Sequence, residues 1–424
     1  MDPLVEGAVD STQTPLPLDQ IKDFAEIFIR IKRNYVEPVS DEQLLDYAVE
    51  GMLNGLDPHS LYMKADRLEE LNEGTTGRFG GLGMEVMMED GFVKIVAPID
   101  DTPAAEAGLR TGDLIIRING KAISGSSLSD ATEQMRGEPG TKVTLTILRE
   151  TQADPFEVEL ERAVINVKTV RRVRMNDQIG YLRVSQFQTG TAESFRKELN
   201  RLRDKETFAG LILDLRNNPG GLLNSAVSIA DIFITEGSIV STKGRLPQND
   251  QEFLASPNDM LEGKPLVVLI NAGSASASEI VAGALQDHKR GLVLGMPSFG
   301  KGSVQTVMHV GEDVGIKLTT ARYFTPSGRS IQAAGIVPDV MVAPREFKSP
   351  TAVMERLTEN DLLGHLENKD APSRNANSAE LIEMLSNDYQ LNEAFNLINA
   401  LVLYQRPNPS PAQDPTATKG EKAG

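Results

Sequence analysis

The sequence predicts an α/β protein: a domain of mostly parallel strands, preceded by a small β-rich module and flanked by helices. Three observations support this prediction. From Gly180 onward, near-continuous apolar strands alternate with helical segments, which is typical of a parallel sheet covered by helices. Residues 77–164 contain short β segments separated by glycines. Near both ends of the chain, helical segments carry apolar residues.

The length and charge of the chain limit what it can be. Its 424 residues are too many for one ordinary core and enough for two or three domains. The net charge of −17 argues against nucleic acid or an anionic membrane as the main partner. The chain has no cysteine, which excludes disulfides, a thiol nucleophile and cysteine-ligated metal sites. We expect no metal and no cofactor, and no apolar run is long enough for a transmembrane segment.

The N-terminal part of the chain is predicted to be helical over residues 17–76. Residues 1–16 are polar and contain prolines, so we expect them to be disordered. Apolar residues recur at helical spacing from Leu18 onward. A second helix is expected after Ser40, because Gln43 follows three residues later in a capping-box pattern.

The remainder divides into four segments. Residues 77–164 form the compact β-module, in which a helix is expected from about Ser127. Residues 165–349 form the α/β domain. Residues 350–404 are helical and partly apolar, and could serve in assembly. Residues 405–424 have the composition of a disordered tail.

The most informative segment follows an apolar strand that ends at Asn271. Glycine, serine and alanine fill the turn before the next helix, and small residues let a backbone approach a substrate closely. The start of a helix also offers unpaired N–H groups. A serine there could attack a carbonyl while neighbouring amides hold the oxyanion. Taken alone, the run is better explained as an ordinary turn with a serine cap.

A serine nucleophile needs a base, and Lys301 is the best candidate. It lies between Gly300 and Gly302, just before a strand, and a lysine can act as base when burial lowers its pKa. Gln305, four residues on, would point to the same side of that strand and could hold the amine. The alternative is a solvated loop lysine. No histidine lies in a strand-end loop suited to a Ser-His-Asp triad. The four histidines are His59, His288, His309 and His365.

A third element is the turn after the apolar strand that ends at Arg216. It contains Gly220 and Gly221, whose amides would lie at the carboxyl end of a parallel strand and suit an oxyanion hole. Taken alone, this turn is weak evidence for an oxyanion hole, because many turns between strands and helices contain glycine pairs.

In this order, and with the β-module upstream, these elements resemble the carboxyl-terminal processing peptidases, also called tail-specific proteases. The resemblance covers about residues 20–345, and the ordered set is far more specific than any single motif. The motifs are Leu56-Asp57-Pro58-His59-Ser60, Gly81-Leu82-Gly83-Met84, Leu213-Asp214-Leu215-Arg216-Asn217-Asn218-Pro219-Gly220-Gly221, Gly273-Ser274-Ala275-Ser276-Ala277-Ser278-Glu279, Phe299-Gly300-Lys301-Gly302 and Ile336-Val337-Pro338-Asp339.

The resemblance implies a crotonase/ClpP-like α/β core with an inserted PDZ domain. It also implies a serine endopeptidase that cleaves proteins at or near their C-termini. Ser276 maps to the nucleophile, Lys301 to the general base and Gln305 to its orienting partner. Asp287, one helix length after Ser276, has an acidic counterpart in some members, and we interpret it as structural because a Ser-Lys dyad needs no acid.

Two further groups of residues follow from the same resemblance. The oxyanion donors map to the amide of Ala277 and to one amide of the Gly220 and Gly221 pair, with Gly221 preferred. Ser274 and Ser278 are the rival nucleophiles, and Ser278 is expected inside the helix, where its hydroxyl would more naturally cap.

The PDZ assignment has its own physical basis. Consecutive amides in the turn Gly81-Leu82-Gly83-Met84 can capture a terminal carboxylate, and the adjoining strand can accept a peptide by β-addition. The helix from about Ser127 would form the other wall of the groove. In gated family members an arginine at the end of this helix relays the PDZ position to the active site, and Arg136 matches it. The alternatives are a β-module that binds nothing and an exposed arginine at a helix end.

Two other functions remain open. A crotonase-type acyl enzyme would use the oxyanion hole on a thioester and would not need Ser276 and Lys301 together. A PDZ adaptor with a silent core is disfavoured, because Ser276, Lys301 and Gln305 are all present.

Location and partners are expectations from the resemblance. Gram-negative members usually work in the periplasm, so we expect a periplasmic protein whose signal peptide is absent from this sequence. Its partners would be protein substrates, captured by their C-terminal tails, and a lipoprotein adaptor built of helical repeats. The apolar faces of the terminal helices favour a homo-oligomer.

Overall fold

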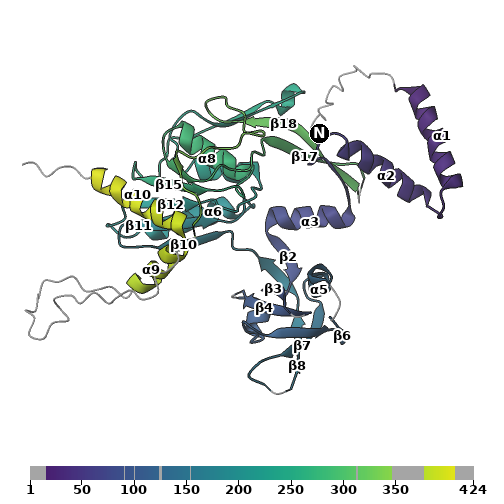
Figure 1. Cartoon of the computed structure of the whole chain (residues 1–424), viewed down its shortest axis with the longest axis horizontal. Coiled ribbons are helices and arrows are strands. Elements are labelled where there is room, and N and C mark those ends of the chain that lie inside the picture. Colours follow the sequence, from purple (N-terminus) through teal and green to yellow (C-terminus); the bar gives the residue numbers. More distant parts are fainter. Residues whose placement is uncertain are drawn as a thin grey trace, which may run out of the picture. The chain divides into compact units, whose positions relative to one another are not determined.

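The computed structural model describes residues 16–89, 91–99, 101–123, 127–152, 154–311, 314–345 and 377–405 (Figure 1). The described residues form two compact units, one within residues 1–68 and 305–319 and the other within residues 69–304 and 320–424. The predictions for residues 1–15, 346–376 and 406–424 lie outside the described residues.

The first unit contains both predicted N-terminal helices. Ser40 caps the second of them by accepting a hydrogen bond from the backbone N–H of Gln43 at 3.1 Å. The Gln43 side chain donates to the Tyr47 hydroxyl at 2.8 Å instead of reaching back, so only half of the predicted capping box forms. The elements are α1 (Leu18–Asn34), α2 (Asp41–Asn54), β1 (Leu61–Lys64), most of β17 (Ser303–His309) and the first part of β18 (Val314–Phe324).

The apolar stripe of α1 stays exposed. This helix buries none of its residues, and Ile21, Phe24 and Ile27 are each about half exposed. An ion pair between Lys32 and Asp41 joins α1 to α2. The helix therefore carries an unpartnered apolar face within its own unit.

The second unit begins with the β-module. Its sheet has the order β3-β4-β5-β7-β8, so β3 is an edge strand. Ser127 and Asp130 form a reciprocal capping box at the start of α5, which confirms the predicted helix. The elements are β2 (Arg78–Gly81), β3 (Met84–Glu89), β4 (Phe92–Pro98), α4 (Pro103–Glu106), β5 (Leu114–Ile118), β6 (Lys121–Ala122), α5 (Leu128–Met135), β7 (Lys142–Leu148), β8 (Phe156–Glu161) and β9 (Ala163–Asn166).

The mostly parallel sheet of the second unit confirms the predicted α/β domain. Five of its strands, in the order β11-β12-β15-β16-β19, run parallel, and β10 adds antiparallel at the edge. Every residue of β12 and β15 is buried, as expected for strands covered on both faces. The strands are β10 (Val170–Arg174), β11 (Ile179–Val184), β12 (Gly210–Asp214), β15 (Leu266–Ile270), β16 (Leu292–Gly295) and β19 (Val340–Met341).

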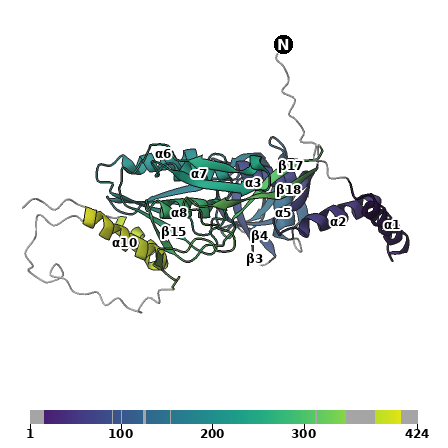
Figure 2. The same ribbon diagram turned by 90° about the horizontal axis from the view of Figure 1, so that it is seen from above.

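Helices cover both faces of this sheet (Figures 1 and 2). On one face, α6 (Thr191–Arg203), α7 (Leu223–Ala230) and α8 (Ala277–Asp287) share a core with alternate strand residues. On the other face, α10 (Tyr389–Gln405) packs on the remaining strand residues. No helix in the described part of the chain is both long enough and apolar enough to cross a bilayer.

Some elements were not predicted. Strands β13 (Ser238–Gly244) and β14 (Gln251–Leu254) pair with each other, and the last residues of β18 pair with β13. Helices α3 (Ala65–Thr76) and α9 (Asn377–Asn387), in contrast, fall within the segments 17–76 and 350–404 that were predicted to be helical. The late strand β18 matters for the site, because it carries Tyr323 into the main core.

Candidate active site

Ser276 lies where the parallel sheet meets a helix. It follows the carboxyl end of β15 and is the residue immediately before α8. Its backbone has φ +54° and ψ −112°, a conformation that non-glycine residues rarely adopt. The side chain is in a buried position, with 8% of the residue exposed. Strain at a turn of this kind is characteristic of functional sites, and it persists only where surrounding contacts enforce it.

The hydroxyls of the two rival serines are hydrogen-bonded to backbone groups. The hydroxyl of Ser274 donates to the carbonyl of Leu215 at 2.8 Å and accepts from the N–H of Asn271 at 3.0 Å. The hydroxyl of Ser278 donates to the carbonyl of Asn218 at 2.9 Å. Both serines are fully buried. Their hydroxyls therefore hold the turn together.

A buried carboxylate joins the Ser276 turn to the Lys301 loop. Glu279 is fully buried in the first turn of α8. Its Oε2 accepts hydrogen bonds from the backbone N–H groups of Ser276 at 2.7 Å and Lys301 at 2.9 Å. Its Oε1 accepts from the hydroxyl of Ser298 at 2.5 Å and the N–H of Gly300 at 2.7 Å. One side chain therefore fixes the relative positions of the two backbones that carry the candidate nucleophile and base.

The Lys301 loop is packed too tightly for larger residues. A Cβ on Gly302 would lie 2.4 Å from the backbone nitrogen of Gln332. Gly300 has φ +91°, a conformation that favours glycine. Lys301 itself is half-buried between these two glycines. The glycines that flank Lys301 in the sequence are therefore required by the packing of its loop.

Gly220 and Gly221 differ in what their backbone N–H groups contact. Gly220 donates its N–H to Oδ1 of Asn218 at 2.9 Å, so this amide is engaged. A Cβ on Gly220 would lie 2.7 Å from the Ala275 carbonyl and 2.9 Å from Cβ of Ser276, so its role is to allow close approach. Among the described residues, no acceptor is found for the N–H of Gly221 or of Ala277. The geometry therefore favours Gly221 over Gly220 as an oxyanion donor.

A buried ion cluster anchors the loop that carries these glycines. Arg216, 7% exposed, pairs with Asp214 at 2.7 Å and with Asp388 at 2.6 Å. Desolvation opposes the charge on Asp388, but its hydrogen bonds and attraction to Arg216 hold its pKa below the usual range. Tyr181 adds a hydrogen bond to Asp214 at 2.8 Å. The loop that carries Gly220 and Gly221 is thereby tied to Asp388, the residue that precedes α10.

Gln305 belongs to the first unit, whereas Lys301 belongs to the second. There the Gln305 side chain donates to the Thr319 hydroxyl at 3.3 Å, and that hydroxyl donates to Asp57 at 3.1 Å. Asp57 also accepts from the N–H groups of the following turn, at His59 and Ser60. The structure thus connects Gln305 with the Leu56–Ser60 motif.

Asp287 has a structural environment, in agreement with the prediction. Its Oδ2 accepts from the N–H of Ser327 at 3.0 Å, and its Oδ1 lies 3.4 Å from a nitrogen of Arg329. Desolvation by burial works against its charge, but the hydrogen bonds to Thr325 and Ser327 and the charge of Arg329 lower its pKa overall. Asp287 therefore secures the turn after β18.

Two hydrogen bonds to backbone carbonyls fix the predicted carboxylate-binding turn of the β-module. The carbonyl of Leu82 accepts from the N–H of Ala104, and that of Gly83 accepts from the Thr102 hydroxyl, each at 2.9 Å. Gly83 has φ +75°, and a Cβ there would collide with Thr102. Gly81 ends β2, and Met84 begins the edge strand β3.

Arg136 contacts the segments that lead into the module. Its guanidinium pairs with Glu73 of α3 at 2.7 Å and lies 4.7 Å from the ring centre of Phe79 in β2. The structure therefore places Arg136 against α3 and β2, and no described contact joins it directly to Ser276.

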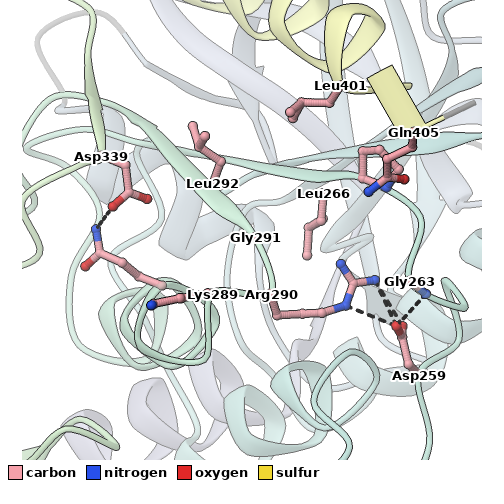
Figure 3. Close-up of a pocket in the computed structure, with 12 residues that line it drawn as sticks. Asp259, Gly263, Leu266, Lys289, Arg290, Gly291, Leu292, Asp339, Leu401 and Gln405 are labelled. Carbon is pink, nitrogen blue, oxygen red and sulfur yellow. Dashed lines mark hydrogen bonds and ion pairs between the residues drawn. The ribbon is translucent and has the colours of Figure 1, made fainter. Parts of the chain in front are cut away.

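A cavity of about 480 Å³ lies at the amino ends of strands β15 and β16 (Figure 3). Leu266 and Leu292, which begin β15 and β16, line it, whereas Ser276 follows the opposite end of β15. Arg290 pairs with Asp259 in its wall at 3.0 Å, and Asp339 accepts from Gln286 at 2.9 Å. These contacts hold the wall together, and the cavity is separate from the candidate active site because the two lie at opposite ends of β15.

Sequence reasoning missed three residues of the site: Asn218, Glu279 and Tyr323. Asn218 and Glu279 stand inside quoted motifs, but no role was expected for them. Tyr323 lies far from every motif around Ser276, and its backbone N–H donates to the carbonyl of Gly302, the residue after Lys301, at 2.8 Å.

Three family models match the chain. Peptidase family S41 matches residues 178–342, the PDZ domain matches residues 80–160, and the activating protease CtpB N-terminal domain matches residues 3–67.

Curated relatives and a solved structure are also similar to this chain. A carboxy-terminal-processing protease of Bartonella bacilliformis is 45% identical over 399 residues, covering 92% of this chain and 91% of the relative. A probable CtpA-like serine protease of Staphylococcus epidermidis is 34% identical over 344 residues, covering 80% of this chain and 68% of the relative. The solved photosystem II D1 C-terminal processing protease is 30% identical, with a TM-score of 0.47, and covers 76% of this chain and 92% of that chain.

Proposed function

Because the chain belongs to the carboxyl-terminal processing proteases of peptidase family S41, which are serine peptidases, we propose that Ser276 is its nucleophile and Lys301 its general base. The observation that carries the proposal is the buried Glu279 carboxylate, which binds the backbone N–H groups of both residues. The expected PDZ domain and α/β peptidase core agree with the family matches. These matches do not support the crotonase-type acyl enzyme.

The proposed reaction is acyl transfer through a covalent intermediate. The Ser276 hydroxyl attacks the peptide carbonyl as neutral Lys301 takes its proton. The amides of Gly221 and Ala277 hold the oxyanion. Lys301 then protonates the leaving amine, and water hydrolyses the acyl-enzyme. Gln305 is proposed to orient Lys301, as the family resemblance implies.

Lys301→Arg tests the base. Arginine keeps its charge at any usable pH, so this variant should fold but fail to degrade an unfolded protein substrate. Wild-type turnover should rise with pH through the pKa of Lys301 and then flatten. Lys289→Arg, at an exposed helix-end lysine, is the matched control and should keep wild-type turnover. An active Lys301→Arg enzyme would remove Lys301 from the mechanism.

We further propose that the PDZ domain captures substrate C-termini and gates the site. The turn Gly81-Leu82-Gly83-Met84 would hold the carboxylate, and the edge strand β3 would pair with the tail. In support of gating, Arg136 pairs with Glu73, and the neighbouring Gly74 carbonyl accepts from Gln188 at 3.2 Å.

The chain of contacts continues to the oxyanion loop. Phe187, next to Gln188, donates its N–H to the Gly220 carbonyl at 2.9 Å. Arg136→Ala should therefore change turnover more than tail affinity. An amidated C-terminus should bind less tightly than the free acid to full-length Ser276→Ala. Unchanged turnover of Arg136→Ala would refute the gating proposal. Equal affinity for the free acid and the amide would refute capture of the terminal carboxylate.

The domain division, location and assembly belong to the same proposal. We assign residues 17–76 to the N-terminal helical segment, 77–164 to the PDZ domain, 165–349 to the peptidase core and 350–404 to a C-terminal segment. The exposed apolar face of α1 supports a homo-oligomer. The family resemblance supports a periplasmic location and a lipoprotein adaptor with helical repeats. Cell fractionation tests the location, and measurement of the mass of the purified protein in solution tests the assembly.

A further inference from the structure

Asn218 contacts both segments that would form the oxyanion hole. Its side-chain Oδ1 accepts from the N–H of Gly220 at 2.9 Å, and its backbone carbonyl accepts from the N–H of Ala275 at 3.0 Å. We propose that Asn218 is a positioning residue of the oxyanion hole, which holds the amides of Gly221 and Ala277 in one arrangement. This inference rests on the proposed function, because it needs both amides to bind the oxyanion.

The Asn218 side chain is fixed by the end of strand β11. It is fully buried, and its Nδ2 donates to the carbonyl of Val184, the last residue of β11, at 2.9 Å. Because Nδ2 faces a carbonyl oxygen and Oδ1 faces an N–H group, the amide can bind in only one orientation. The backbone carbonyl of Asn218 also accepts from the Ser278 hydroxyl at 2.9 Å. One residue therefore joins the loop of Gly220 to a sheet strand and to the start of α8.

The direction of the Gly221 amide follows from the peptide bond before it. The carbonyl of Gly220 accepts from the N–H of Phe187 at 2.9 Å. In a trans peptide such as this one, the carbonyl and the following N–H point in opposite directions, so the Gly221 N–H points away from Phe187. The carbonyl of Phe187 in turn accepts from the N–H of Leu222 at 2.8 Å. Since Asn218 holds the N–H of Gly220 and Phe187 holds its carbonyl, the peptide that carries the Gly221 amide cannot rotate freely.

The two proposed oxyanion amides adjoin, and the glycines between them need an external restraint. A Cβ on Gly220 would lie 3.0 Å from the nitrogen of Ala277 and 2.9 Å from Cβ of Ser276. Gly220 and Gly221 have φ +102° and +137°, and glycine has more freedom to leave such a conformation than any other residue. An oxyanion hole works because its donors are aimed before the reaction begins. The bonds of Asn218 supply that restraint.

Asn218→Ala is the direct test, because it removes both side-chain bonds. The kcat for an unfolded protein substrate should fall by about 10- to 100-fold with KM nearly unchanged, since loss of a whole oxyanion donor costs roughly 100- to 1,000-fold. The affinity for a peptide aldehyde, which bonds to Ser276 and places its oxygen in the hole, should fall by a similar factor. Substrate affinity, measured with Ser276→Ala also present, should not change. A loss of stability alone would leave the aldehyde affinity of the folded enzyme unchanged.

Asn176→Ala is the matched control, since it removes another asparagine side chain that holds backbone N–H groups at an end of β11. The Oδ1 of Asn176 accepts from the N–H groups of Gln178 at 2.9 Å and Ile179 at 2.6 Å, and Ile179 is the first residue of β11. This variant should lower the unfolding midpoint without changing the aldehyde affinity.

If Asn218→Ala does not fold, Asn218→Asp takes its place, because its carboxyl still accepts from the N–H of Gly220. A smaller loss of kcat and of aldehyde affinity is then expected. Wild-type kcat and aldehyde affinity in the variant that folds would overturn the inference and leave Ser276 in place. Proteolysis by Ser276→Ala would instead overturn the proposed function, and this inference with it.

Discussion

Glu279→Gln should damage the site out of proportion to its small chemical change. The carboxylate accepts four hydrogen bonds, two on each oxygen. An amide cannot accept on its nitrogen. In the cheaper orientation the amide nitrogen faces Ser298, whose hydroxyl can accept, but it also faces the N–H of Gly300. At least one buried N–H then loses its partner, and the remaining bonds lose the help of the negative charge.

The expected cost can be worked from these bonds. A hydrogen bond to a charged group contributes about 1.5–3 kcal/mol, and an unpaired buried donor costs about as much. We therefore expect a total of at least about 2 kcal/mol, shared between stability and the alignment of Ser276 with Lys301. If all of it falls on alignment, turnover drops roughly 30-fold. If all of it falls on stability, the free energy of unfolding drops by the same amount.

The assay measures both quantities on one sample: urea unfolding, and turnover of an unfolded protein substrate. Glu193→Gln, at an exposed glutamate of α6, is the control for removing one negative charge. It should change neither quantity. A Glu279→Gln enzyme with wild-type stability and wild-type turnover would refute the idea that Glu279 holds the two loops together.

Two further predictions concern the oxyanion loop. Gly220→Ala should abolish turnover, because the added Cβ would lie 2.7 Å from the Ala275 carbonyl oxygen and the residue has φ +102°. Wild-type activity in this variant would contradict the close packing of the loop. Asp388→Asn should destabilise the protein at pH 7, because the lowered pKa of Asp388 means that its charge stabilises the fold above the ordinary carboxyl pKa. That stabilisation is lost as pH falls through the lowered value, so denaturation should show the variant and wild type converging below about pH 4. A stability difference between wild type and Asp388→Asn that stays constant with pH would contradict the stabilising role of the Asp388 charge.

The sequence predicted the parallel sheet and its helices because their signals are local. The buried runs of β12 and β15 and the turn before α8 can each be recognised from a few neighbouring residues. The same holds for the capping box of Ser127 at α5. The second half of the capping box at Ser40 failed because a tyrosine one turn away competed for the Gln43 side chain.

The contacts that sequence reasoning missed join separate segments of the chain. Asp388 pairs with Arg216 across 172 residues, and no local pattern marks that pair. Glu279 lies inside a motif, but its partners Ser298 and Lys301 come from a separate loop. Tyr323 holds the carbonyl of Gly302 from β18, which pairs with β13 in a sheet that was not predicted. Sequence patterns supplied the candidate groups for the chemistry, and the fold showed what holds them.

The central claim is that Ser276, rather than a neighbouring serine, forms the covalent intermediate. The most direct measurement is mass spectrometric mapping of the residue that a fluorophosphonate modifies in the active enzyme. The hydroxyls of Ser274 and Ser278 are engaged with the carbonyls of Leu215 and Asn218, so the adduct should map to Ser276 alone. The adduct should also be absent from Ser276→Ala. An adduct on Ser274 or Ser278 in the wild-type enzyme would contradict the account.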